Sequence, residues 1–92
     1  MQTTAAEAFA LEVLGWLASD PERIGAFLGW SGEAPGNLAR RATDPAFLLA
    51  VLDFLMLDDA MVIRASADLG VDPTFPGRAR QALPGGADMH WT

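Results

Sequence analysis

The chain has 92 residues, of which 51% are apolar and 20% charged, a formal net charge of −6, and no cysteine. This length suffices for one domain with a single core, and the composition is that of a globular protein. The lack of cysteine and lysine excludes disulfides, Cys-based zinc sites, Schiff bases and lysine nucleophiles. The negative charge repels phosphate backbones and anionic lipids, which argues against nucleic acids and membranes as partners.

The N-terminal stretch predicts a helix from Thr3 or Thr4 to about Ala18, with Glu7 completing a capping box behind Thr4. Apolar residues recur along it at steps of three and four and predict one broad buried face: Ala6, Phe9, Ala10, Val13, Trp16 and Leu17. The stretch lacks the basic region of a signal peptide and carries acidic residues within its apolar run. We therefore expect a cytoplasmic protein.

A second, short helix is predicted from Pro21 to about Trp30. Asp20 before Pro21 is a strong helix start, because Asp can cap the first turn and Pro fits the first helical position. Three apolar residues are expected to face inward: Ile24, Phe27 and Leu28. Gly25 and Gly29 lie one turn apart, which we interpret as close packing against a neighbouring helix. A contact face for a partner is the alternative.

The most apolar stretch of the chain runs from Pro45 to Leu57, and Asp53 is its only polar residue. Apolar residues fall all round the helical wheel, which indicates a helix buried on most sides, and the run is too short to cross a bilayer. A weak helix from Leu38 to Ala42 precedes this stretch, and Asp44 is the expected N-cap of the helix that begins at Pro45. We predict an all-α fold, a compact bundle of five or six short helices around a central helix at about residues 45–57.

Two further helices complete the predicted domain. A fifth helix runs from Ala60 to Leu69 and is closed by Gly70 with a positive φ. The last helix is expected to begin near Phe75 and to run to Leu83, because the proline that follows Phe75 fits a first helical turn. Residues 1–86 then form a single domain, and residues 87–92 a short C-terminal tail.

Asp53 is the most interesting polar side chain. Its neighbours three and four positions away are all apolar: Leu49, Ala50, Met56 and Leu57. A buried, unpaired carboxylate costs several kcal/mol, so Asp53 should reach an arginine, a backbone donor or water. Arg40, Arg41 and Arg64 are the plausible partners. We interpret Asp53 as a member of a structural ion pair or as a residue on the one hydrated side of its helix. A functional acid and a contact to a partner are the alternatives.

The sequence contains none of the motifs that mark common catalytic or cofactor sites. There is no G-x-S-x-G, P-loop, H-E-x-x-H or Rossmann glycine pattern. The acidic residues Asp58 and Asp59, and Glu22 near Asp20, lack the alternation and central glycine of a calcium loop, and helix capping accounts for them. We therefore expect a protein that is not an enzyme and holds no metal or cofactor, with a carboxylate-based enzyme or metal site at Asp53 as a remote alternative.

Residues 24–41 have the outline of a helix-turn-helix, with two short helices, a glycine-containing turn and a second helix that ends in Arg40 and Arg41. However, Pro35 and Gly36 stand where base-reading side chains are needed, and the acidic surroundings give no electrostatic footprint for DNA. A DNA-binding regulator is therefore the alternative function and not the first.

The chain carries more aromatic and methionine side chains than one small core usually needs. Those left exposed would form an adaptable patch for a partner or a second copy of the chain. The candidates for this patch are Trp16, Trp30, Met56 and Met61. In the tail, His90 and Trp91 could dock on the domain, bind in trans or remain free. The leading hypothesis is a non-enzymatic interaction or adaptor module that binds an unknown protein partner or forms a homodimer.

Several stretches carry a family resemblance: Asp20–Arg23, Asp44–Leu48, Val51–Leu55, Asp58, Ala79–Arg80 and Leu83–Gly86. Through them the chain resembles, from about Ala5 to Gly86, a family of short bacterial proteins catalogued as a domain of unknown function. The resemblance implies a small, cytoplasmic, helical protein without an assigned activity or catalytic residues. The chain departs from the family pattern at Pro76 and Gly77, which affects the expected length of the last helix.

Overall fold

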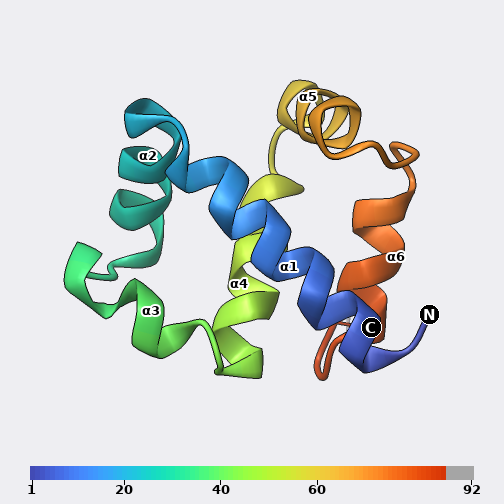
Figure 1. Ribbon diagram of the computed structural model, residues 1–92, viewed down its shortest axis with the longest axis horizontal. Coiled ribbons are helices and arrows are strands. Elements are labelled where there is room, and N and C mark those ends of the chain that lie inside the picture. Colours follow the sequence, from blue (N-terminus) through green and yellow to red (C-terminus); the bar gives the residue numbers. More distant parts are fainter. Residues whose placement is uncertain (87–92) are drawn as a thin grey trace, which may run out of the picture.

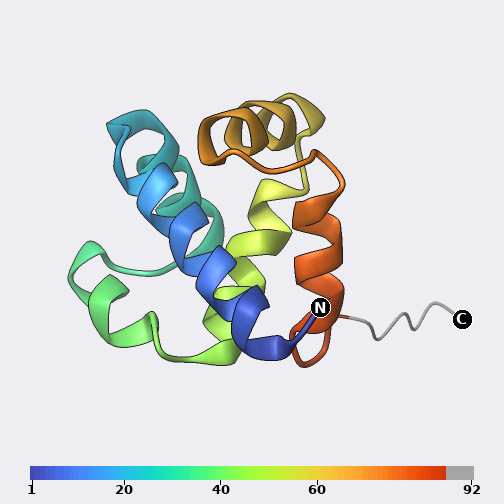
Figure 2. The same cartoon turned by 45° about the vertical axis from the view of Figure 1, so that its right-hand side comes forward.

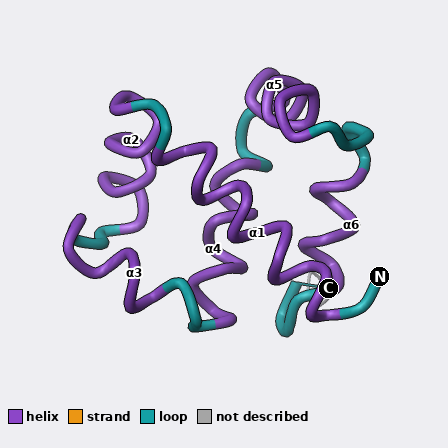
Figure 3. The backbone as a smooth tube through the Cα atoms, in the orientation of Figure 1, coloured by secondary structure: helices purple, strands orange, loops and turns teal. Residues whose placement is uncertain are grey.

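Six α-helices joined by short turns form the part of the chain that the computed structural model describes, residues 1–86 (Figures 1 and 3). No strand occurs in this range. The helices are α1 (Thr3–Ala18), α2 (Pro21–Ser31), α3 (Leu38–Arg41), preceded by a 3₁₀ turn at Pro35–Asn37, α4 (Pro45–Leu55), α5 (Asp59–Leu69) and α6 (Phe75–Ala82). The predicted all-α fold is confirmed. The expectations for the tail, including His90 and Trp91, lie outside the described residues.

The core forms where α1 crosses α4. In Figure 1, α1 runs diagonally across the front of α4, with α2 on the left, α6 on the right and α5 above; Figure 2 shows the same crossing from a second side. Helix α1 contacts α2, α4, α5 and α6, while α4 contacts α1, α2 and α6. The largest side chains that are fully buried come from α1, α2 and α4: Leu17, Phe27, Phe47, Leu52 and Leu55. None of the described helices is long and apolar enough to span a bilayer.

Local capping sets the beginnings of three helices. The side chains of Asp20, Asp44 and Asp58 each accept a hydrogen bond from the backbone N–H two residues ahead, at 2.9 to 3.0 Å. Such bonds satisfy donors that the first helical turn leaves without partners. Gly70 closes α5 at a φ of 73°, a left-handed conformation that glycine adopts without steric cost. The predicted starts of α2 and α4 and the predicted end of α5 are confirmed, while α5 begins at Asp59, one residue before its predicted start.

The start of α1 differs from the prediction. Its N-cap is Gln2, and no side chain caps the helix, so the capping box of Thr4 and Glu7 does not form. The helix begins at Thr3, which places Thr4 inside the first turn and out of the capping position. The hydroxyl of Thr3 instead donates to the carbonyl oxygen of Ala82 at 3.1 Å and ties the start of α1 to the end of α6.

Helix α4 is central but not covered on all sides. Its buried face holds six residues: Phe47, Leu48, Val51, Leu52, Phe54 and Leu55. The opposite face begins with exposed Ala46, continues with half-buried Leu49, Ala50 and Asp53, and leads to exposed Met56. The helix ends at Leu55, two residues before the predicted end, because Met56 and Leu57 form the turn that leads to α5. The prediction of burial on most sides is confirmed, and the side that carries Asp53 is the one left partly open.

Candidate functional site

Asp53 forms an ion pair with Arg80 of α6, and not with any of the three arginines predicted from the sequence. The Nε of Arg80 donates to Oδ1 of Asp53, and each side chain is about one-third exposed, at 34% for Arg80 and 35% for Asp53. Nη1 of Arg80 also donates to the carbonyl oxygen of Gly86 at 3.1 Å. At Gly86 a Cβ would lie 1.7 Å from the carbonyl oxygen of Arg80, so only glycine fits there. The pair thus holds the C-terminal turn against α4 and α6, and the structural interpretation of Asp53 accounts for its position.

The other predicted arginines lie elsewhere. Arg41 pairs with Glu33 at 3.1 Å and with Asp44 at 2.6 Å, which holds the loop after α2 against the start of α4. Arg40 is exposed, and Arg64 lines a separate cleft beside Trp16. The helix that would read DNA, α3, is four residues long and follows a 3₁₀ turn, and its Arg41 is engaged by two carboxylates. The geometry does not favour a helix-turn-helix.

Three exposed apolar side chains gather in one groove. Trp30, Met56 and Leu57 are 47%, 38% and 66% exposed, and with the Asp53–Arg80 pair they line a space of about 410 Å³. We call these five residues the Trp30 groove. It lies on the uncovered side of α4, bounded by the last turn of α2 and by α6.

Aromatic packing fixes the position of Trp30. Its ring centroid lies 5.5 Å from that of Phe54 on α4 and 6.3 Å from that of Phe27 on its own helix. One side of the indole thus packs on the core while nearly half of the side chain faces solvent. Of the four predicted interface residues, Trp30 and Met56 line the groove. Trp16 is buried at 7% exposure, and Met61 is half-buried in the separate cleft.

The outer face of α2 is open. A Cβ added at Gly25 or at Gly29 would have no heavy atom within 4 Å from outside its own helix. The interpretation of these glycines as close packing is therefore wrong, because α2 lies at the edge of the bundle with Phe27 as its only fully buried residue. The alternative, a face that contacts a partner, stays a prediction.

Within residues 1–86, no three acidic or histidine side chains come together as metal ligands. Hydrogen bonds from the hydroxyl and then the backbone N–H of Thr74 lower the pKa of the Asp72 carboxyl group from the ordinary 3.8. This residue caps the turn before α6, which is a structural role.

The described fold is all-α, and three exposed apolar side chains lie together in the Trp30 groove. The chain belongs to the family described as a protein of unknown function, DUF3572, whose model matches residues 3–86. The resemblance to a family of unknown function is thereby confirmed. No curated protein and no solved structure matches the chain.

Pro76 and Gly77, where we expect a departure from the family pattern, lie at the start of α6. Pro76 occupies the first turn of this helix and is fully buried, and a Cβ at Gly77 would lie 3.5 Å from the terminal methyl carbon of Met56. The helix spans eight residues and ends at Ala82, one residue before the predicted end. This distance is an ordinary van der Waals contact, so Gly77 lies against a methionine that lines the Trp30 groove.

Proposed function

We propose that this protein is a non-enzymatic, cytoplasmic interaction module whose Trp30 groove binds an amphipathic helix of a partner protein. The observation that carries the proposal is the convergence of Trp30, Met56 and Leu57 on one groove. These are three of the six large apolar side chains that are exposed within residues 1–86. Contiguous apolar surface of this kind marks interaction sites more often than scattered exposed residues do.

The chemistry of the groove supports a helical peptide as its occupant. Trp and Met are enriched in interface cores, and Met adapts its shape to different partners. The groove combines these apolar walls with one ion pair at its edge, which suits the apolar face of a helix with anchors at spacings of three, four and seven residues.

The charge of the residues beside the groove indicates which residues should flank the apolar face of the partner helix. Asp58 and Asp59 follow Leu57 directly, and neither forms an ion pair with any residue of the described part of the chain. The whole chain carries a net charge of −6. Partners with complementary charge associate faster and more selectively, so basic residues are expected beside the apolar anchors of the partner helix.

A matched pair of variants tests the groove. Leu57→Ser removes an apolar side chain that is 66% exposed inside the groove, and Ile63→Ser removes one that is 60% exposed outside it. Helical peptides are selected on the full chain from a displayed library whose members carry either basic or acidic flanks. We expect basic-flanked peptides whose affinity falls at least tenfold with Leu57→Ser and is unchanged with Ile63→Ser. Equal effects of the two variants, or a preference for acidic flanks, would refute the proposal.

Light scattering behind a sizing column, over a tenfold concentration range, tests whether a second copy of the chain occupies the groove. We expect a monomer whose mass is independent of concentration. A dimer that Leu57→Ser dissociates and Ile63→Ser does not would show that a second copy of the chain fills the groove in place of a partner helix.

A further inference from the structure

The turn that follows α6 ends at the edge of the Trp30 groove. Nη1 of Arg80, whose side chain lines the groove, donates to the carbonyl oxygen of Gly86 at 3.1 Å. The backbone N–H of Gly86 donates in turn to the carbonyl oxygen of Leu83 at 2.9 Å. The peptide bond that leads to residue 87 contains the carbonyl held by Arg80. The chain therefore leaves its described part beside a wall of the groove.

Two glycines fix the course of this turn. Gly85 has a φ of 87°, and a Cβ there would lie 3.4 Å from Cδ2 of Leu49 on the uncovered side of α4. Gly86 has no room for a Cβ at all. The same side of α4 carries Asp53 and leads to Met56, which both line the groove. The turn and the groove thus share one side of the molecule.

The six residues after Gly86 have a composition that suits an apolar groove. They read Ala-Asp-Met-His-Trp-Thr, and tryptophan and methionine are among the residues enriched in interface cores. Met89 and Trp91 lie two positions apart, a spacing that places side chains on one side of an extended segment. Six extended residues span about 20 Å, and the groove begins one hydrogen bond away from Gly86. The segment is therefore long enough to enter the groove of its own chain.

We infer that residues 87–92 occupy the Trp30 groove of their own chain when no partner is bound, with Met89 and Trp91 against its apolar wall. The inference rests on the proposed function in one respect, the use of this groove as a binding surface. It adds a regulatory contact, because a partner helix must displace the segment before it can bind. A short covalent link raises the effective concentration of the segment to about the millimolar range, which compensates for its small size.

Charge explains why a partner can displace the segment. Residues 87–92 contain no arginine or lysine. They therefore lack the complementarity with Asp58 and Asp59 that favours a partner helix with basic flanks. The segment covers the apolar wall, while the partner gains both the apolar contact and the charge match.

NMR spectroscopy of the full chain tests the contact directly. The chain has three tryptophans, so its indole N–H signals are few enough to assign one by one. We expect nuclear Overhauser cross-peaks between the ring protons of Trp91 and the methyl group of Met56. Trp91→Ser should shift the indole signal of Trp30. Ala87→Ser is the matched control, because it changes the same segment and keeps both of its large apolar side chains.

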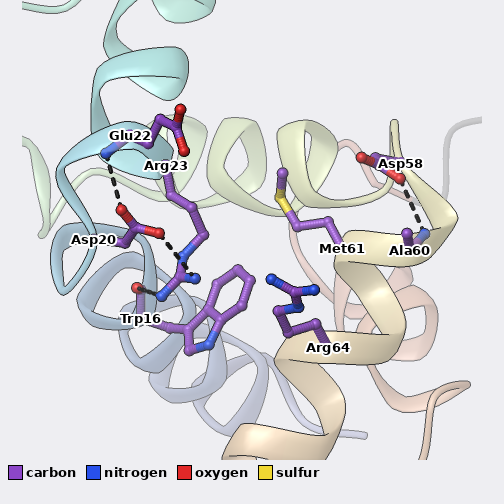
Figure 4. Close-up of a pocket in the computed structure, with 8 residues that line it drawn as sticks. All are labelled: Trp16, Asp20, Glu22, Arg23, Asp58, Ala60, Met61 and Arg64. Carbon is purple, nitrogen blue, oxygen red and sulfur yellow. Dashed lines mark hydrogen bonds and ion pairs between the residues drawn. The ribbon is translucent and has the colours of Figure 1, made fainter.

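Trp16 is the internal reference for these spectra. Its indole N–H donates to Asp68 at 2.8 Å. The guanidinium carbon of Arg23 lies 3.9 Å from its ring centroid, in the separate cleft between α2 and α5 (Figure 4). This cleft shares no lining residue with the Trp30 groove, so the Trp16 signal should stay in place in both variants.

Peptide binding separates this inference from the proposed function. For the selected helical peptides we expect Trp91→Ser to raise the affinity at least threefold, because the competing segment is weakened, and Ala87→Ser to leave it unchanged. Cross-peaks together with no peptide binding would support the docked segment and refute the partner helix. Peptide binding that Trp91→Ser does not change, without cross-peaks, would refute the docked segment and leave the partner helix standing.

Two further results would overturn the inference. A Trp30 signal that shifts equally in Trp91→Ser and Ala87→Ser would show that the apolar side chains make no specific contact. Cross-peaks that disappear on dilution, together with the mass of a dimer in light scattering, would show that the segment enters the groove of a second copy and not that of its own chain.

Discussion

Replacing Phe27 by alanine should remove a large part of the stability of the fold. Phe27 is fully buried, and its ring centroid lies 5.7 Å from that of Phe47 and 5.4 Å from that of Phe54, both in edge-to-face geometry. It is the only buried residue of α2, so the attachment of that helix depends on it. A buried Phe→Ala change costs about 3 to 5 kcal/mol through lost burial and the cavity left behind.

The total stability against which this loss is measured is small. At about 0.05 to 0.15 kcal/mol per residue, a chain of 92 residues has roughly 5 to 14 kcal/mol. Phe27→Ala should therefore lower the melting temperature by at least about 12 °C, at roughly 4 °C per kcal/mol for a domain of this size.

Urea and thermal unfolding followed by circular dichroism measure the change. The matched control is Trp30→Ala in the same helix, where the side chain is 47% exposed and about 1 kcal/mol is expected from partial burial. A loss below about 1.5 kcal/mol for Phe27→Ala, or equal losses for the two variants, would refute the idea that the aromatic cluster anchors α2.

Three further predictions concern α4 and the turn before α6. Leu52→Asp places a charge where the side chain is fully buried and should abolish the cooperative thermal transition; a melt near that of the wild type would contradict the central position of α4. Asp53→Asn and Arg80→Gln, combined in a double-mutant cycle, should give a coupling of about 0.2 to 1 kcal/mol, because the pair is partly exposed; zero coupling would show that the contact adds no stability. Asp72 has a lowered pKa in the folded state, so its contribution to stability is present above the ordinary pKa of 3.8 and is lost as the pH falls through the folded pKa. Thr74→Ala should raise the pKa of Asp72 in an NMR carboxyl titration, and an unchanged pKa would exclude the Thr74 hydroxyl as its main cause.

Local signals in the sequence predicted where most helices begin and end. The aspartates that cap α2, α4 and α5 and the glycine that closes α5 act through bonds to residues at most a few positions away. Their effect is therefore contained in short stretches of sequence. The capping box at Thr4 and Glu7 failed because the N-cap is Gln2, two residues earlier, which places Thr4 inside the first helical turn.

The candidate sites were predicted only in part. Trp30 and Met56 were recognised as surplus apolar residues, but their convergence with Leu57 depends on how α2, α4 and α6 pack. The partner of Asp53 was missed because Arg80 lies 27 positions away on a helix whose orientation no local pattern indicates. Nothing in the sequence indicates the cleft beside Trp16, because α2 and α5 border it only in the folded chain.

The sequence by itself determined the helical class, the capped starts of α2, α4 and α5, and the apolar residues from which the core is built. Periodicity and capping are short-range properties, so they can be read without knowing the fold. Only the tertiary structure decided which faces stay uncovered: the side of α4 that carries Asp53, the outer face of α2 with its two open glycines, and the cleft beside Trp16. The physical reason is that an apolar pattern shows which side chains gain from burial, whereas the number and arrangement of the other helices determine which of them become buried.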